Sequence, residues 1–279
     1  MFGQIQPLTV ADLPGCLALA RDRDWLPEER KWRLLFDLAV VYGVRDPGGE
    51  LAGVTVLTRY GAAFAVIGMM LVASRYAGRG LGRALMTHAL ADVGDATVFL
   101  HATPVGRPLY EKLGFVPVGV TRTHLGCFRP ADPVPAPGRS RLAGPGDLMA
   151  IRRLDAQANG IDRALLVRRL PGFTGQLRVV ERLGTVTGYA GAYEGLRYVS
   201  IGPVVADADD DAKTLIADAA ATASGPVRID LDDRHPRLLV WAAERGLAPG
   251  VSSTAMVLGG RRLPGDRARC FAPLMRALG

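Results

Sequence analysis

Apolar and polar positions follow two different periods along the first half of the chain. Short runs that are apolar throughout or at every second residue predict strands, and apolar positions three or four residues apart predict helices. Antiparallel strands followed by a strand–helix–strand unit indicate an α/β fold of the α+β kind. Its sheet would be mixed, with helices on both faces of the sheet. The pattern predicts strand 3–8, helices 10–21 and 27–38, strands 39–45, 51–59 and 62–73, helix 80–93, strand 96–102, helix 105–113 and strand 116–126.

The second half of the chain repeats this order of segments weakly. "TVADLPGCLAL" resembles "GPGDLMAIRRL", which aligns Asp12 with Asp147, and "AVIGMMLVA" resembles "YVSIGPVVA", which aligns Ile67 with Ile201. Five such matches in the same order predict one fold used twice, with chance similarity between two α/β halves as the alternative.

A proline-rich stretch separates the two halves. The sequence "PADPVPAPGRS", residues 130–140, has no apolar periodicity and is typical of a stiff, extended linker. We therefore expect two domains, 1–129 and 141–279, on either side of it.

Composition narrows the class of protein and of ligand. The 279 residues are 49% hydrophobic and carry a net charge of +7, nearly all of it from arginine. This favours anionic ligands, but the arginines are scattered and aromatic residues are only 6%, so we expect no nucleic-acid partner. The sequence predicts a cytoplasmic protein without signal peptide or membrane span, and it leaves a homodimer open. The three cysteines, Cys16, Cys127 and Cys270, are predicted to be buried thiols, and with four histidines we expect no metal.

The stretch "RYAGRGLGRAL" places three glycines on alternate positions between a strand and a helix. Gly78, Gly80 and Gly82 leave backbone N–H groups bare at the positive end of a helix dipole, and Arg79 and Arg83 add charge. The lysine of a Walker loop is missing, and so is the third glycine of a dinucleotide fingerprint. The pattern predicts a single turn that binds pyrophosphate, with a tight turn that binds nothing as the alternative.

Together with "GRPLYEKLGF", this stretch resembles the GNAT superfamily of acetyl-CoA-dependent N-acyltransferases. Residues 77–82 resemble its R/Q-x-x-G-x-G/A segment, with Ala77 in place of the leading R/Q. Tyr110, Gly114 and Phe115 resemble its Y-x-x-x-G-F signature. The resemblance implies tandem GNAT-like domains, the second divergent. Each would have a mostly antiparallel sheet with one splayed parallel strand pair.

The resemblance also implies where acetyl-CoA, the acyl donor, would bind. The pantetheine arm would lie between strands 66–72 and 96–102, with Thr103 in place of a commonly found asparagine. The implied cofactor contacts are Met70, Leu71, Val72, Ala77, Gly78, Arg79, Gly80, Leu81, Gly82, Arg83 and Thr103.

Each candidate residue for catalysis or for acceptor binding also has a purely structural alternative. Tyr110 is the candidate general acid for the departing thiolate, or else an aromatic core residue. His101 is a candidate base or water-holder, or else a satisfied core histidine. Asp24 and Glu28 could hold the amine acceptor before it loses its proton, or else merely cap and solvate a helix.

The second half lacks the signatures of the first. Four aspartates stand where the glycine loop would be, and Ala242 aligns with Tyr110, with Trp241 one position away. Because carboxylates would repel the cofactor's phosphates, we expect this half to bind no CoA and to wall the acceptor pocket instead. The aspartates are Asp207, Asp209, Asp210 and Asp211.

The sequence thus predicts an N-acetyltransferase that moves an acetyl group from acetyl-CoA to a primary amine by direct attack. The amine would belong to a small molecule, an amino acid or a lysine side chain. Two alternatives stay open. One is a sensor or scaffold that binds acyl-CoA without turnover. The other is a transferase with an acyl-tRNA donor, for which affinity would depend steeply on salt.

Overall fold

The computed structural model describes residues 2–130 and 140–279. The chain forms two compact units, one ending at Leu100 and joined by Leu278, the other running from His101 to Ala277 with Gly279. Most of the predicted linker, residues 131–139, lies outside the described residues. No helix in the described ranges is both long and apolar enough to cross a membrane.

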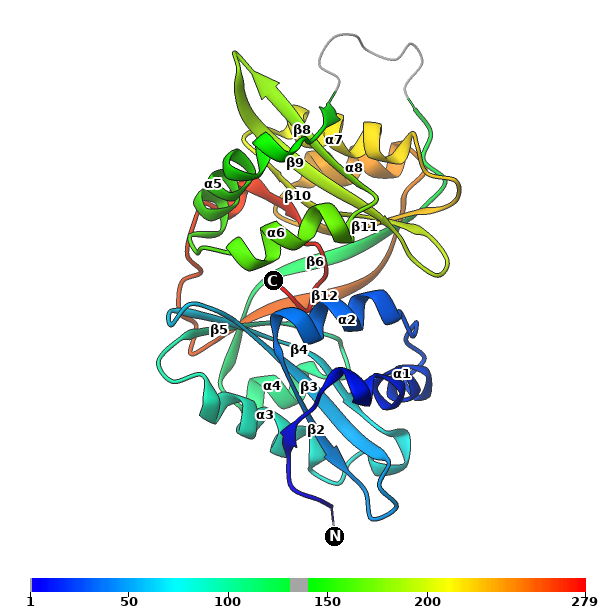
Figure 1. The fold of residues 1–279 in the computed structure, drawn as a ribbon, viewed down its shortest axis with the longest axis vertical. Coiled ribbons are helices and arrows are strands. Elements are labelled where there is room, and N and C mark those ends of the chain that lie inside the picture. Colours follow the sequence, from blue (N-terminus) through cyan, green and yellow to red (C-terminus); the bar gives the residue numbers. More distant parts are fainter. Residues whose placement is uncertain (1, 131–139) are drawn as a thin grey trace. The chain divides into compact units, whose positions relative to one another are not determined.

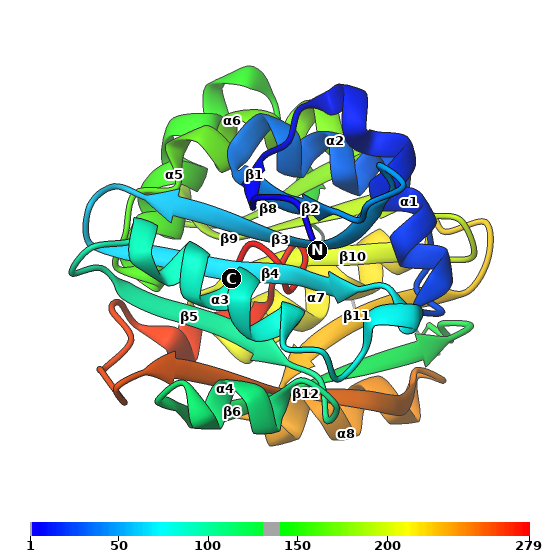
Figure 2. The same cartoon turned by 90° about the horizontal axis from the view of Figure 1, so that it is seen from below.

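Unit 1 is a sheet of order β1-β2-β3-β4-β5, antiparallel except for the parallel pair β4–β5. Helices α1 and α2 cover one face and α3 the other (Figure 1, Figure 2). Every element predicted for this part is present within about three residues. The bounds are β1 Gln6–Pro7, α1 Leu13–Asp22, α2 Glu29–Leu38, β2 Val40–Arg45, β3 Leu51–Tyr60, β4 Phe64–Val72, α3 Leu81–Asp92 and β5 Thr97–Ala102.

Close packing of α3 against the sheet fixes the place where this helix begins. Leu81 and Leu85 pack on Val44 and Ala52. A Cβ on Gly53 would lie only 3.0 Å from the Leu85 side chain, so the bare strand lets the helix approach. The start of α3 is therefore held by buried side chains on its inner face.

Unit 2 contains a sheet of order β12-β6-β11-β10-β9-β8-β7, with β13 beside β10. Helices α5 and α6 cover one face of it and α7 the other (Figure 1). The bounds are α4 Arg107–Lys112, β6 Phe115–Gly126, β7 Arg141–Leu142, α5 Leu148–Asn159, α6 Ala164–Phe173, β8 Gln176–Arg182, β9 Thr185–Glu194, β10 Val199–Ala206, α7 Asp209–Ala220, β11 Val227–Asp232, α8 Pro236–Glu244, β12 Ala248–Leu258 and β13 Cys270–Ala272.

Strand β6 belongs to the first half in sequence and to the sheet of unit 2 in space. It lies between β11 and β12 and pairs antiparallel with both, as in Thr123↔Asp230 and Thr121↔Ser253. The spatial division of the chain at 100/101 therefore differs from the division into domains 1–129 and 141–279, which stays a prediction.

The internal repeat is visible in local structure. The Asp12 carboxylate accepts the N–H of Thr9 at 2.8 Å, and the aligned Asp147 carboxylate accepts the N–H of Gly144 at 2.7 Å. Each also pairs with an arginine, Asp12 with Arg45 and Asp147 with Arg141. The predicted fold class, with a splayed parallel strand pair in each copy, is confirmed.

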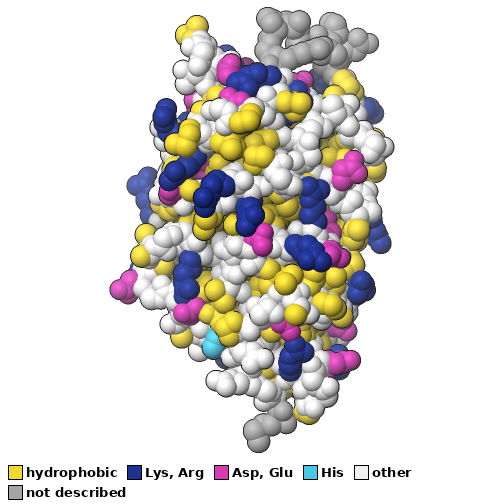
Figure 3. All heavy atoms as spheres, in the orientation of Figure 1, with side chains coloured by type: hydrophobic (Ala, Val, Ile, Leu, Met, Phe, Trp, Pro, Cys, Tyr) yellow, Lys and Arg dark blue, Asp and Glu magenta, His cyan; other side chains and the backbone are white. Residues whose placement is uncertain are grey.

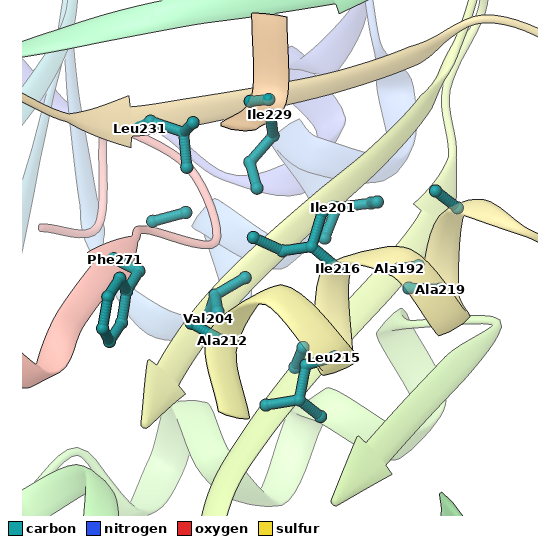
Figure 4. Close-up of a cluster of buried hydrophobic side chains, with 14 of the residues drawn as sticks. Ala192, Ile201, Val204, Ala212, Leu215, Ile216, Ala219, Ile229, Leu231 and Phe271 are labelled. Atoms are coloured by element: carbon teal, nitrogen blue, oxygen red, sulfur yellow. The ribbon is translucent and has the colours of Figure 1, made fainter. Parts of the chain in front are cut away.

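The core of unit 2 lies between α7, α8 and the strands β9, β10 and β11. Figure 4 shows Ile201 and Val204 of β10 packed with Leu215 of α7 and Phe271 of β13.

Of the three cysteines, Cys16 is buried and Cys270 partly so, but Cys127 is exposed, so the prediction of buried thiols is wrong for Cys127. Cys127 follows the end of β6, where the strand has left the sheet.

Candidate functional site

In unit 1, β4 and β5 part halfway along their length. Their parallel register runs from Phe64↔Thr97 to Ile67↔Leu100 and ends there. The first four residues of β4 are buried, whereas Gly68, Met69, Met70 and Val72 are partly exposed. Beyond Ile67, therefore, β4 has β3 on one side and no strand pairing on the other in the part of the chain that the structure describes.

A β-bulge lies at this point of β4. Met69 and Met70 together oppose the single residue Thr55 of β3, and Met69 has a positive φ of 48°. A bulge leaves one residue out of the ladder and turns backbone groups away from the neighbouring strand. The strand end predicted to contact the cofactor, Met70 to Val72, therefore has backbone groups to offer along a partly exposed edge.

The glycine loop follows directly. Gly78 and Gly80 have φ of 75° and 80°, which favour glycine, and a Cβ on either would meet nothing within 4 Å. Gly80 is the N-cap of α3, and its carbonyl accepts the N–H of Ala84 at 3.0 Å. The N–H groups of the first turn, including that of Gly82, have no acceptor inside the helix. The loop is exposed, so these donors can serve an anion.

Acidic side chains anchor the segment that precedes the loop glycines. The Asp22 carboxylate at the end of α1 accepts the N–H of Ser74 at 2.6 Å. Asp46 accepts the Tyr76 hydroxyl and the Arg75 guanidinium, each at 2.9 Å, and Arg75 also pairs with Glu50. Sequence reasoning missed these anchors, because nothing in the pattern links residues so far apart.

Two arginines of the loop remain available. Arg79 and Arg83 are exposed, and among the described residues neither has an ion pair. The Arg79 guanidinium lies 5.7 Å from the centre of the Tyr76 ring. On the face seen in Figure 3, basic side chains are interspersed with acidic ones, in line with the scattered arginines of the sequence.

Tyr110, on α4 in unit 2, is a buried phenol. Its ring packs 6.1 Å from that of Phe115 and against Gly106, and burial raises its pKa to about 12. At neutral pH the hydroxyl therefore keeps its proton. Thr103 has a local task, since its hydroxyl accepts the N–H of Gly106 at 3.2 Å before α4 begins.

His101, also in unit 2, is neutral at ordinary pH. Burial lowers its pKa to about 3, and the positive charge of Arg276 adds to the shift. Its Nδ1 lies 3.5 Å from the Ser253 hydroxyl. A neutral imidazole can hold a water molecule, but a group with so low a pKa is a weak base.

Near His101 in the sheet of unit 2 lies a polar network that sequence reasoning missed. The Asp230 carboxylate accepts the Thr123 hydroxyl at 2.7 Å and the Arg276 guanidinium at 3.1 Å. Arg228 also pairs with it at 3.1 Å. The alternation in "VRIDLD" puts Asp230 on the polar face of β11, which was the available signal.

The predicted acceptor residues lie between α1 and α2. Asp24 is exposed, in a turn with φ of 57°. Glu28 is the N-cap of α2, and its carboxylate pairs with Lys31. Glu28 is thus engaged within its own helix, while Asp24 is accessible.

The aligned region of the second half is built differently. Eight residues, 73–80, separate β4 from α3, but only two, 207 and 208, separate β10 from α7. Asp211 is 2% exposed, and its carboxylate accepts Arg182 at 2.6 Å and the Thr187 hydroxyl at 2.7 Å. The glycine loop has no counterpart here.

The alignment of Tyr110 with Ala242 agrees with the helix ends. Gly114 and Gly246 end α4 and α8 with φ of 89° and 87°, and each donates its N–H to the carbonyl three residues before it. Tyr110 and Ala242 each stand four residues before their glycine. Among the described residues there is no group of three or more His, Cys, Asp or Glu that could hold a metal ion.

Comparisons with known proteins agree with this geometry. Two family models, each described as an acetyltransferase (GNAT) domain, match residues 40–128 and 151–272. The uncharacterized N-acetyltransferase YitH of Bacillus subtilis is 26% identical over 95% of this chain and 94% of its own length.

Solved structures share the fold of the whole chain. A provisionally described acetyltransferase from Pyrococcus horikoshii has a TM-score of 0.83 at 19% identity, covering 99% of this chain and 95% of that one. A tandem GNAT protein from the clavulanic acid biosynthesis pathway has a TM-score of 0.68 at 17% identity, covering 94% of this chain and 100% of that one. Because the two GNAT family models together match more than half of the chain, the chain belongs to the GNAT family of acetyltransferases and carries two such domains in tandem.

Proposed function

We propose that this protein transfers an acetyl group from acetyl-CoA to a primary amine of a small molecule, an amino acid or a lysine side chain. The observation that carries the proposal is in unit 1. There, a partly exposed edge of β4 leads directly into a glycine loop and a helix start without a side-chain cap. An extended amide chain that ends in phosphates matches that sequence of donors.

The donor would lie along β4 and the loop. Backbone groups of Met70 and Val72 would pair with the pantetheine amides, and Leu71 would contact the cofactor between them. One N–H of this strand would stabilise the oxyanion that forms on the thioester carbonyl. The pyrophosphate would meet residues 77–83, with Arg79 and Arg83 adding positive charge. The Thr103 hydroxyl accepts the N–H of Gly106, and it would contact the pantetheine arm through its remaining hydrogen-bonding capacity.

The transfer would proceed by direct attack. The nitrogen of the neutral amine forms a bond to the thioester carbon, and the carbon–sulfur bond then breaks. The thiolate takes the proton of Tyr110, and the tyrosinate regains one from solvent. The attacking nitrogen loses its extra proton to water, which His101 is suited to hold as a neutral imidazole. Asp24 would attract the ammonium form of the acceptor, with Glu28 as a second carboxylate.

The location that we propose for the protein is the cytoplasm.

Titration calorimetry with acetyl-CoA, followed by a thiol-release screen of amines, tests the proposal. We expect one site per chain and thiol release with at least one class of primary amine. Binding without thiol release for any amine would favour the acyl-CoA sensor. Absence of binding would exclude acetyl-CoA as donor, and salt-dependent affinity for acyl-tRNA would then favour the third alternative.

A further inference from the structure

The edge of β10 that corresponds to the free edge of β4 is occupied by the chain itself. The parallel register of β10 with β11 ends at Ile201↔Ile229, just as that of β4 with β5 ends at Ile67↔Leu100. Beyond that point β13 runs antiparallel to β10, with Val204↔Ala272 and Val205↔Cys270. All eight residues of β10 are buried, whereas the end of β4 is partly exposed.

Both copies also have the same irregularity here. In β10, Gly202 and Pro203 together oppose Gly191 of β9, within one residue of the bulge in β4. A Cβ on Gly202 would collide with the carbonyl oxygen of Pro273, so the C-terminal segment passes tightly against the bulge. The bulge that turns backbone groups outward in β4 thus meets a peptide in β10.

Side chains fix β13 in this place. Phe271 is 2% exposed and lies in the core with Val204 (Figure 4). The His235 ring stacks on Phe271 with the ring centres 4.0 Å apart. His235 Nε2 also lies 3.0 Å from the Cys270 carbonyl oxygen. A strand held by the core and by a ring contact is part of the folded unit rather than a loose end.

The charges at the end of this strand are reversed relative to unit 1. Arg269 pairs with Asp207, the first residue after β10 and just before the acidic start of α7. In unit 1, the corresponding loop after β4 carries Arg79, and the first turn of α3 carries Arg83 and no acids. A cationic peptide in one copy therefore stands where the first copy is suited to an anionic cofactor.

We propose that residues 267–273 are a built-in occupant of the second copy's acyl-CoA edge. The β13 backbone takes the place of the pantetheine arm, and Arg269 takes the place of the phosphates. The proposal rests on the proposed function, because it assumes that the free edge of β4 binds acyl-CoA. The second copy then binds the C-terminal segment of its own chain and no cofactor.

This occupant also positions the residues that follow it. The Tyr193 hydroxyl donates to the carbonyl oxygen of Leu274 at 3.3 Å, and the Arg276 guanidinium donates to the Thr123 hydroxyl at 2.7 Å and to Asp230. The C-terminal segment is thus laid over β9, β6 and β11. In the second copy, the edge that would bind a ligand therefore holds the C-terminal segment in place instead.

Hydrogen–deuterium exchange on the full-length protein, with and without acetyl-CoA, tests the proposal. We expect the amides of Met70 and Val72 to exchange at least about tenfold more slowly with acetyl-CoA, because they gain acceptors and lose access to water. The amides of 204–205 and 270–272 should be slow already and change less than about twofold. Cofactor-induced slowing at 204–205, or free exchange at 270–272, would overturn the proposal.

Two variants sharpen the experiment. Phe271→Leu should accelerate exchange at 270–272 and at 204–205 together, because each strand is the other's partner, and leave 70–72 unchanged. Arg269→Asp should accelerate exchange at 270–272, and the added change Asp207→Arg should restore it. Failure of the charge reversal to restore protection would show that Arg269 does not act through Asp207. If acetyl-CoA slows no amide at all, the proposed function fails, while protection of 270–272 without cofactor still decides whether β10 is occupied.

Discussion

Strands β4 and β10 hold the same place in two copies of one fold and end in opposite ways. Both pair in parallel with the next strand for a few residues and then part from it, and both have a bulge at that point. After β4 comes an exposed glycine loop of eight residues, and two arginines are available there, Arg79 in the loop and Arg83 in the first turn of α3. After β10 come two residues and a helix that begins with Asp209, Asp210 and Asp211.

The difference shows that the fold alone does not make a cofactor site. The splayed strands and the bulge survive in both copies, because they are part of how the sheet packs. What differs is the loop length, the sign of the charge and whether the strand edge is taken. Aspartates satisfy a helix start from within the chain, whereas glycines leave it for a ligand. This division predicts that changes in the first copy alter binding and that changes in the second alter stability.

The largest effect is expected from Gly82→Glu. A carboxylate in the first turn of α3 would compete with the cofactor's phosphates for the same N–H groups and repel them. We expect acetyl-CoA affinity to fall at least about 100-fold, which is about 2.8 kcal/mol. The melting temperature should stay within a degree or two, because Gly82 has ordinary helical geometry and an acid suits a helix start. Calorimetry and thermal unfolding measure the two quantities.

The matched control is Asp210→Gly, the second residue of α7 as Gly82 is of α3. Asp210 is 82% exposed in its side chain, so its loss should change neither acetyl-CoA affinity nor the number of sites. A second site in this variant would show that the aspartates, and not the occupied edge, exclude the cofactor from the second copy.

Tyr110→Phe is expected to lower kcat about 100-fold, within the usual range for loss of a general acid, with little change in KM for acetyl-CoA. An aromatic change in the second copy, Trp241→Phe, one position before the aligned Ala242, should leave kcat unchanged. Because burial raises the pKa of Tyr110 to about 12, the acid form persists up to that pH. The rate should therefore show no falling limb below about pH 10, and a limb near pH 8 to 9 would point to another acid.

Sequence alone could predict much of this molecule and missed its long-range pairings. Strands such as 51–60 and 64–72 followed from periodicity, and the glycine loop followed from local chemistry. The insertion of β6 between β11 and β12 could not be predicted, because strand order is not encoded in the period of a single strand. Strand β13 has three residues and no counterpart in the first copy, so neither periodicity nor the repeat could indicate it.

The candidate site shows the same limit. The loop glycines and Tyr110 were legible as signatures, but Asp22 and Asp46, which hold the loop, are identified only by their contacts. The neutral state of His101 depends on burial and on Arg276, which lies 175 residues further along the chain. Local sequence reports residue types, whereas charge state depends on the folded surroundings.

Asp211→Ala should reverse the pattern expected for Gly82→Glu. It removes a buried carboxylate that accepts hydrogen bonds from Arg182 and Thr187. Because Arg182 is well exposed and can be solvated, we expect a loss of about 1–2 kcal/mol in the free energy of unfolding. Acetyl-CoA affinity per folded molecule should not change. Denaturant unfolding together with calorimetry checks both, and Asp210→Ala, at an exposed neighbour, is the control.

His101→Gln is expected to have the smallest effect on turnover, less than about tenfold, because a neutral histidine and a glutamine can both hold water by hydrogen bonds. The pH dependence of stability is the sharper measurement. Burial and Arg276 lower the pKa of His101 in the folded state from 6.5 to about 3, so between these values the unfolded state binds one more proton. The wild type should therefore lose stability relative to the variant as the pH falls from 6.5, by up to about 1.4 kcal/mol per unit. The other lowered histidines, His124 and His235, are common to both proteins and cancel in the difference. Equal pH slopes for the two proteins would mean that His101 titrates normally. A large loss of turnover with an inflection near pH 6.5 would then restore it as the general base, in the copy whose cofactor edge is still free.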